Sequence, residues 1–264
     1  MSFLSALEQF NENRNTLKMT TGSADLDSLI DGIQEGFYLF YGNNHVDLDA
    51  LVYTFLVNCV LPLKQRHGFE SMAVCINNSD YYDQRKTAAL NPEKIGIAAK
   101  CAGIEPKIIF KNLYVHLAYN EQHQLAVAEQ VAGLIESNSD IKLLVVNNIT
   151  KFFRESKNKM EAANNLKQEV GIISKACTKN KVALVCTGDA NTTAKGIIPR
   201  PIGGIYLKHA ANVIVHFKEF SKTNGIPSFK ATLIKHQYTK TQICNNVCTE
   251  SLGNDDARLR GDYT

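Results

Sequence analysis

The sequence lacks any run approaching eighteen consecutive apolar residues, and its mean hydropathy is −0.18. We therefore expect no membrane-spanning helix, because a span needs about 20 predominantly apolar residues. The first residues, MSFLSALEQFNENR, carry no basic stretch before an apolar run, so we predict no secretory signal peptide. Internal repeats and low-complexity tracts are missing as well. These absences predict a cytoplasmic globular protein with no membrane partner.

The cysteine count and the charge balance narrow the class of protein. Seven cysteines at irregular spacing, without an export signal, predict reduced thiols rather than a disulfide framework. A chain of 264 residues can bury its own core, so it needs no disulfide or metal to fold. A net charge of +3 permits a polyanionic partner but falls short of the strongly basic character of a dedicated nucleic-acid binder.

Apolar runs of strand length alternate with helical stretches from residue 20 onward, which predicts one α/β core domain over residues 20–264 behind an arm of residues 1–19. The alternation favours a mainly parallel sheet flanked by helices, and the strands at the C-terminal end, which have no helix between them, favour antiparallel pairing. The expected strands are 37–41, 72–76, 113–117, 141–146, 182–186, 212–217, 229–235 and 241–247. The expected helices are 48–63, 92–102, 122–135 and 160–178.

Five separate stretches follow one another in the order and spacing of a known family. They are TTGSADLD (20–27), Leu61-Pro62, residues 90–124 ending in LYVHLAYNEQHQ, IKLLVVNNITKFFR (141–154) and PIGG (201–204). On these stretches the chain resembles the archaeal RadA recombinases and their paralogs, RecA-like ATPases of homologous recombination. The resemblance covers residues 3 to 250 approximately, and it implies a RecA-like ATPase core.

The residues that would bind ATP depart from the pattern of that family. A phosphate-binding loop needs glycines for its backbone, a lysine for the phosphates and a hydroxyl for magnesium, yet no G-K-S/T sequence occurs in the chain. At the loop's position stands GNNHVDLD (42–49), with Leu48 in place of the lysine and Asp49 in place of the hydroxyl residue. The degenerate nucleotide site comprises Gly42, Asn43, Asn44, His45, Asp47, Leu48, Asp49, Ser79, Asn147 and Asp189.

Each departure in this set removes a group that the family uses to bind or hydrolyse ATP. Asn147 stands at the magnesium-holding aspartate of the family, Ser79 near its catalytic glutamate, and Asp189 in the pair of residues that senses the γ-phosphate. Asp47 replaces the last glycine of the loop, and its carboxylate would repel a triphosphate. The resemblance with these departures implies a pseudo-ATPase with no catalytic residues and no cofactor.

Two alternatives stay open for the altered loop. If the alignment is displaced by a residue, a rearranged loop still binds nucleotide. Asp47 or Asp49 is expected to cap the following helix and complement its dipole. A metal site made of His45, Asp47, Asp49 and Asp189 fits the spacing, but we prefer the capping interpretation and predict no metal.

The arm carries Phe3-Leu-Ser-Ala6, and the family polymerises through a Phe-x-x-Ala motif that docks on the next protomer and extends its sheet. The resemblance therefore implies docking of Phe3 and Ala6 on a RadA-type recombinase or on a second copy. The alternative is an N-terminal amphipathic helix that packs on its own domain.

Two loops that grip DNA in the family keep several basic residues here. The first contains Arg154, Lys157 and Lys159, and the second contains Lys195 and Arg200. Basic side chains bind phosphates in a salt-dependent, sequence-independent way, so we expect weak binding of single-stranded DNA. The alternative is that these are ordinary lysines and arginines of solvated loops.

The function predicted from the sequence is that of a non-catalytic RadA paralog that assists homologous recombination or DNA repair, independently of ATP. It would bind the recombinase, single-stranded DNA or both. A divergent RecA-family ATPase that still binds ATP and DNA, and a RecA-fold scaffold or signalling protein unrelated to DNA, are the alternatives.

Overall fold

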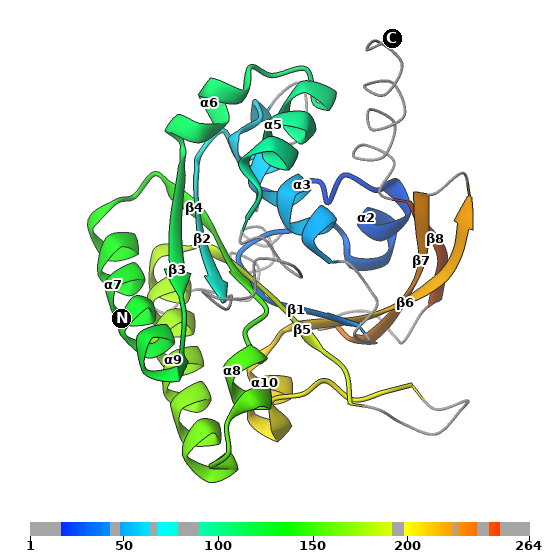
Figure 1. Ribbon diagram of the computed structural model, residues 1–264. Helices are drawn as coiled ribbons and strands as arrows, with labels where there is room; N and C mark the ends of the chain where they lie inside the picture. Colours follow the sequence, from blue (N-terminus) through cyan, green and yellow to red (C-terminus); the bar gives the residue numbers. More distant parts are fainter. Residues whose placement is uncertain are drawn as a thin grey trace, which may run out of the picture.

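The protein is built on one eight-stranded sheet with the strand order β3-β2-β4-β5-β1-β6-β7-β8 (Figure 1). The computed structural model describes residues 17–42, 48–63, 68–78, 90–191, 198–223, 226–236 and 243–248. The strands are β1 (Gly36–Gly42), β2 (Met72–Asn78), β3 (Leu113–Ala118), β4 (Ile141–Asn147), β5 (Ala183–Asp189), β6 (Val213–Thr223), β7 (Ile226–Lys235) and β8 (Ile243–Cys248).

Helices connect the strands of the parallel part of the sheet. They are α2 (Ala24–Ile30), α3 (Asp49–Val60), α5 (Pro92–Cys101), α6 (Pro106–Lys111), α7 (Glu121–Ser137), α8 (Lys151–Glu155), α9 (Lys159–Asn180) and α10 (Gly204–Ala210). None of the helices in the described ranges is long and apolar enough to cross a membrane.

Strand direction follows the division expected from the sequence. Strands β1 to β6 pair in parallel, whereas β7 pairs antiparallel with both β6 and β8. Helical crossovers separate the parallel strands along the chain, and short connections join the last three. The predicted α/β class, a mainly parallel sheet with antiparallel C-terminal strands, is confirmed.

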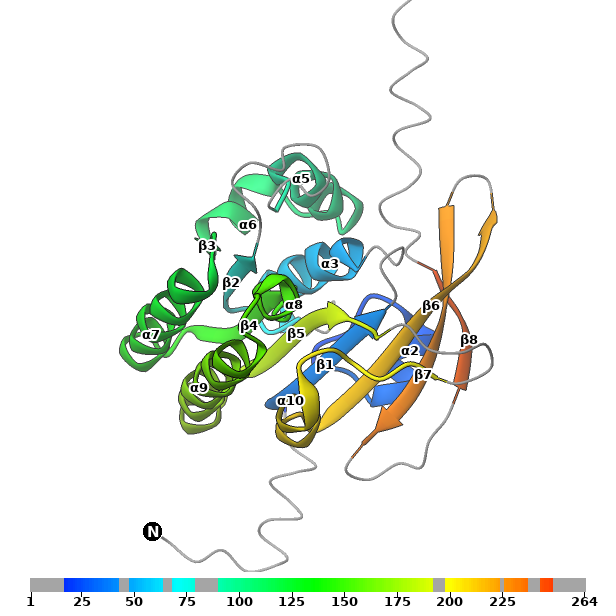
Figure 2. The same ribbon diagram turned by 60° about the horizontal axis from the view of Figure 1, so that its bottom comes forward.

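Helices cover both faces of the sheet (Figure 2), and an apolar cluster lies between each helical layer and the sheet. On one face, α2, α3, α5 and α6 pack over Phe40, Val145 and their neighbours. On the other face, α7, α9 and α10 pack over Leu39, Val146 and theirs. Because the central strands are covered on both faces, they read as continuous apolar runs in the sequence rather than as alternating ones.

Local side-chain chemistry sets the ends of the helices. The Asn120 Oδ1 atom accepts a hydrogen bond from the backbone N–H of His123 at 2.8 Å, which caps α7. Asn91 caps α5 in the same way, and Pro92 occupies its first turn. Lys181 ends α9 in a left-handed conformation, with φ of 54°.

Four short helices, α2, α6, α8 and α10, were not predicted from the sequence. They contain five to seven residues each, which is too short for a helical apolar period to show. Met19, counted with the arm, is buried and pairs with Ile33.

Candidate functional site at the carboxyl edge of the sheet

The carboxyl ends of β1, β2, β4 and β5 bring together residues that are far apart in the chain. Strand register places Gly42 beside Asp189 and Asn77 beside Asn147. In open α/β sheets, ligands bind outside this edge. Four members of the predicted nucleotide site, Gly42, Asp49, Asn147 and Asp189, thus lie at the edge where a ligand would bind. Asn43, Asn44, His45, Asp47 and Ser79 lie outside the described residues.

Asn147 is the centre of a hydrogen-bonded polar network on this edge. Its Nδ2 group donates to Asp49 Oδ1 at 2.9 Å and to Asn77 Oδ1 at 3.0 Å. Its Oδ1 atom accepts from the Thr187 hydroxyl at 2.6 Å. That hydroxyl in turn accepts the backbone N–H of Asn148 at 2.8 Å, so its own hydrogen is free to point at Asn147. The network therefore fixes the orientation of the Asn147 amide, with the nitrogen toward the carboxylate.

The start of α3 lies against this network. Asp49 is the first residue of the helix, where a negative charge complements the helix dipole. The preceding residue, Leu48, makes no side-chain capping hydrogen bond and is only 8% exposed, packed in the core. Among the described residues, no group of three or more histidine, cysteine, aspartate or glutamate side chains could hold a metal ion.

Asp189 and Arg154 form an ion pair a short distance along the same edge. The Arg154 Nη1 group donates to Asp189 Oδ2 at 2.5 Å, and its Nη2 lies 3.5 Å from Glu155 Oε1. Burial raises the pKa of Asp189, and the nearby cations Arg154 and Lys151 partly oppose that rise. The lysine is itself only 5% exposed.

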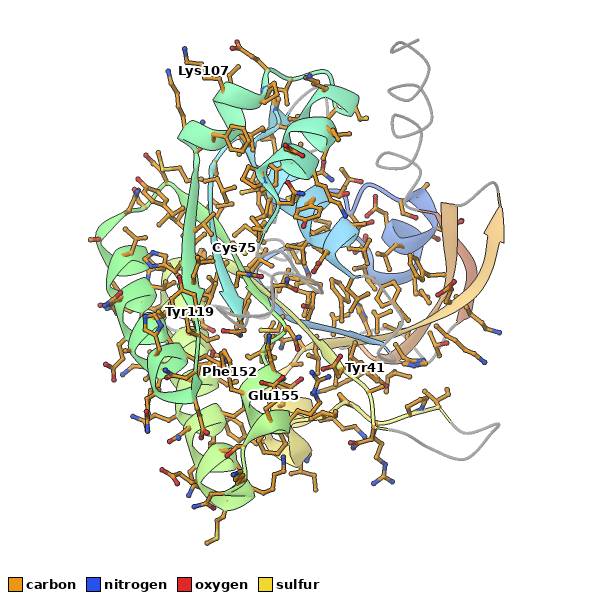
Figure 3. All side chains as sticks on the ribbon, in the orientation of Figure 1. Tyr41, Cys75, Lys107, Tyr119, Phe152 and Glu155 are labelled. Atoms are coloured by element: carbon orange, nitrogen blue, oxygen red, sulfur yellow. The ribbon has the colours of Figure 1, made fainter. Side chains whose placement is uncertain are left out.

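The remaining basic residues of the first loop region have different surroundings. The Lys159 Nζ group donates to the backbone carbonyls of Phe153 at 3.0 Å and Arg154 at 2.6 Å, which satisfies carbonyls at the end of α8. Lys157 is exposed, as is Arg200 of the second loop region. Figure 3 shows α8 with Phe152 and Glu155 labelled, and Tyr41 on β1 near the same edge. Lys195 lies outside the described residues.

A second basic group was missed by the sequence reasoning. Lys218 of β6 and Lys230 of β7 lie directly opposite each other, next to the cross-strand pair His216 and Thr232. His216 is buried, its Nε2 atom has no hydrogen-bond partner among the described residues, and burial lowers its pKa to about 4. Two lysines in a directly opposed pair repel each other, which makes the position suitable for an anion. Only the strand register, which the sequence did not specify, brings them together.

The lysine pair adjoins the second loop region. The ring of His216 lies 5.0 Å from the ring of Tyr41. The Tyr41 hydroxyl donates to the Pro199 carbonyl at 2.8 Å, and Pro199 precedes Arg200 in the chain. The basic residues of the described loop ends and of the β6–β7 pair therefore lie on neighbouring surfaces.

The opposite end of the sheet carries an apolar surface. β3 is the last strand in the sheet order, and within the described ranges its outer edge has no partner strand. Tyr114 and Val115 on β3, and Ile108 and Phe110 on α6, are exposed. An edge strand with exposed apolar side chains is a template for pairing with another chain. Phe3 and Ala6, predicted to dock on such an edge, lie outside the described residues.

Comparison with known proteins places the chain among recombination proteins. A family model described as Rad51 matches residues 12–228. The chain is 29% identical over 226 residues to the DNA repair and recombination protein RadA of Ignicoccus hospitalis, covering 82% of this chain and 68% of that protein. It is 31% identical over 154 residues to the protein of the same name from Metallosphaera sedula, covering 58% and 45%. The RadA protein of Aeropyrum pernix is 28% identical over 228 residues, covering 83% and 68%.

The matched span includes β1 to β6 and both loop regions, and the topology agrees with the match. The chain belongs to the Rad51 family, and its sheet is a RecA-like α/β core.

Proposed function

We propose that this chain is a non-catalytic RadA paralog that assists homologous recombination or DNA repair without hydrolysing ATP. It would act by binding the recombinase, single-stranded DNA or both. The observation that carries the proposal is the Asn147 amide, which donates hydrogen bonds to Asp49 and Asn77 where the family resemblance implies magnesium.

The chemistry of this amide argues against a magnesium nucleotide. Magnesium takes oxygen ligands in octahedral geometry, whereas the group between the two oxygens here is a hydrogen-bond donor that carries no lone pair for a metal. Asp49 Oδ1 and Asn77 Oδ1 each accept a hydrogen bond from it. A metal bound between these two oxygens would displace both hydrogen bonds.

Leu48 supports the same conclusion from the phosphate side. A phosphate-binding loop uses a lysine ammonium to neutralise the β- and γ-phosphates. At that position this chain has an apolar side chain that is 8% exposed and packed in the core. With neither a loop lysine nor a metal-holding aspartate, two of the main electrostatic contributions to phosphoryl transfer are lost.

The proposed binding of DNA and of a partner is supported by other surfaces of the protein than the edge around Asn147. Lys157, Arg200 and the Lys218–Lys230 pair offer positive charge for phosphates. The β3 edge offers exposed apolar side chains, and no strand of the described ranges pairs with its outer side, so it could receive the Phe3-x-x-Ala6 arm of a second copy or of a recombinase.

The test is an assay of nucleotide binding and hydrolysis on the purified chain. We expect no magnesium-dependent ATP hydrolysis above a buffer control and no thermal shift with ATP and magnesium, with a RadA protein measured in parallel as the positive control. Turnover that disappears when residues 42–49 are substituted would establish the alternative, a divergent ATPase. A chain that binds neither single-stranded DNA nor a RadA recombinase would instead favour a scaffold role.

A further inference from the structure

Asp189 lies at a junction between the two loop regions. The first loop region begins at α8, directly after β4, and the second leaves from the end of β5 at Asp189. Besides the Arg154–Asp189 ion pair, the backbone N–H of Ile149 donates to the Thr187 carbonyl at 2.9 Å. The end of β4 and the end of β5 are therefore fastened both by backbone and by charge.

The same residue also fastens the returning end of the second loop region. The backbone N–H of Ile202 donates to the Asp189 carbonyl at 2.8 Å, and that of Asn191 donates to the Arg200 carbonyl at 2.8 Å. Ala190 and Pro201 form a β-bridge between these two hydrogen bonds. Asp189 thus contacts the first region through its side chain and the exit of the second through its backbone.

Tight packing around Thr150, the residue before α8, leaves little room for these parts to slide. Thr150 is fully buried. A Cβ atom added at Gly188 would lie 3.2 Å from its Oγ1, and one added at Gly203 would lie 3.1 Å from its Cγ2. Thr150 therefore contacts both β5 and the start of α10. The Arg154–Asp189 ion pair thus connects elements that already pack closely.

The charge of Asp189 is the feature that DNA binding alone leaves unexplained. A carboxylate beside loops that face a polyanion weakens the attraction. Its partner Arg154 is at the same time engaged by that carboxylate, and the carbonyl of Arg154 accepts from Lys159. These contacts fit a role in holding the loops better than direct contact with phosphates.

We propose that Arg154 and Asp189 are positioning residues, whose ion pair holds α8 against both ends of the second loop region so that the DNA-facing surface forms without a nucleotide. This inference rests on the proposed function, because it concerns DNA binding by a chain that binds no nucleotide. Lys157, Arg200 and the Lys218–Lys230 pair then remain as the basic residues that face phosphate.

The test is whether one substitution strengthens or weakens the binding of single-stranded DNA. Removing the negative charge in Asp189→Asn should strengthen binding of single-stranded DNA if only charge matters. Under the proposal it weakens binding about fivefold, because the loops lose their connection. Glu155→Gln is the matched control: it removes the same charge from the same surface but breaks only the 3.5 Å contact, and its affinity stays equal or rises. The exchanged pair Arg154→Asp with Asp189→Arg restores most of the affinity lost in either single variant.

Amide hydrogen exchange of the DNA-free protein gives a second readout. Asp189→Asn, but not Glu155→Gln, should speed exchange in residues 149–155 and 198–203, and the exchanged pair should restore protection. If the wild-type chain binds no DNA, the proposed DNA role fails while the exchange result still decides the positioning role. Unchanged exchange in Asp189→Asn overturns the positioning role, and so does tighter DNA binding by that variant.

Discussion

Two polar groups lie on the carboxyl edge of the sheet, and they place a carboxylate in different surroundings. Around Asn147, one amide donates to the Asp49 carboxylate and to Asn77 Oδ1 and accepts a hydrogen bond from the Thr187 hydroxyl, so neutral groups surround the carboxylate. Around Asp189, charged groups pair directly at a partly exposed position. The first arrangement places a hydrogen-bond donor between two oxygens, whereas the second pairs two opposite charges directly.

The largest effect on stability is expected from Asn147→Asp, which disrupts the neutral network around Asn147. A second carboxylate then faces Asp49 Oδ1, and two hydrogen bonds become a repulsion, which should lower the free energy of unfolding by about 3 kcal/mol. Magnesium or calcium should recover part of the loss by bridging the carboxylates, which a thermal melt with and without the cation measures. Asn147→Ala serves as the control, since it is destabilised without recovery by cation. Wild-type-like melting of Asn147→Asp would show that the network carries little stability.

A substitution in the N-terminal arm tests whether the apolar β3 edge binds a partner. In Phe3→Ala the melting temperature should stay nearly unchanged, while affinity for a RadA recombinase or for a second copy falls by about 2 kcal/mol or more, as for anchor aromatics at interfaces. Isothermal titration and a melt measure the two effects. The opposite result, a chain destabilised by about 3 kcal/mol with association intact, would mean that Phe3 packs in its own core.

A buried acid close to the first loop region is expected to make the stability of the protein depend on pH. Glu169 of α9 accepts a hydrogen bond from Gln124 Nε2 at 3.0 Å, and that nitrogen also donates to the Ile149 carbonyl at 3.1 Å. Burial raises the pKa of Glu169 to about 8. Since the folded chain holds its proton more tightly than the unfolded chain, stability should fall as pH rises from about 4.5 to 8.

The measurement is the free energy of unfolding across that pH window, for the wild type and for Glu169→Gln. The variant should remove the part of the slope that comes from Glu169, because glutamine has no proton to lose in this window. Identical slopes in the two proteins would assign the pH dependence to other groups.

The smallest effect is expected from the exposed cations. Replacing Lys157 and Arg200 together by glutamine should weaken single-stranded DNA binding and reduce the slope of log affinity against log salt by about 1.4, because each lost phosphate contact contributes about 0.7. Lys159→Gln, whose ammonium is bound to carbonyls at the end of α8, should leave that slope nearly unchanged. A slope that changes only in the Lys159 variant would reverse the assignment of these lysines.

The sequence by itself determined the strands, the four longer helices α3, α5, α7 and α9, and the family resemblance. Apolar runs such as 141–146 need no partner information to be recognised as buried strands, and Pro92 and Gly103 mark the limits of a helix by backbone chemistry alone. That Leu48 and Asn147 stand in place of a phosphate-binding lysine and a metal-holding aspartate stays a prediction from the family resemblance.

Only the tertiary structure decided what those residues contact. That the Asn147 amide faces Asp49, that Arg154 pairs with Asp189 and that Lys218 opposes Lys230 depend on strand order and register. The two partners in the first pair are 98 residues apart, and those in the second are 35 apart. Local propensity carries no information about such pairs, because their energy comes from side chains that meet only after the sheet has assembled.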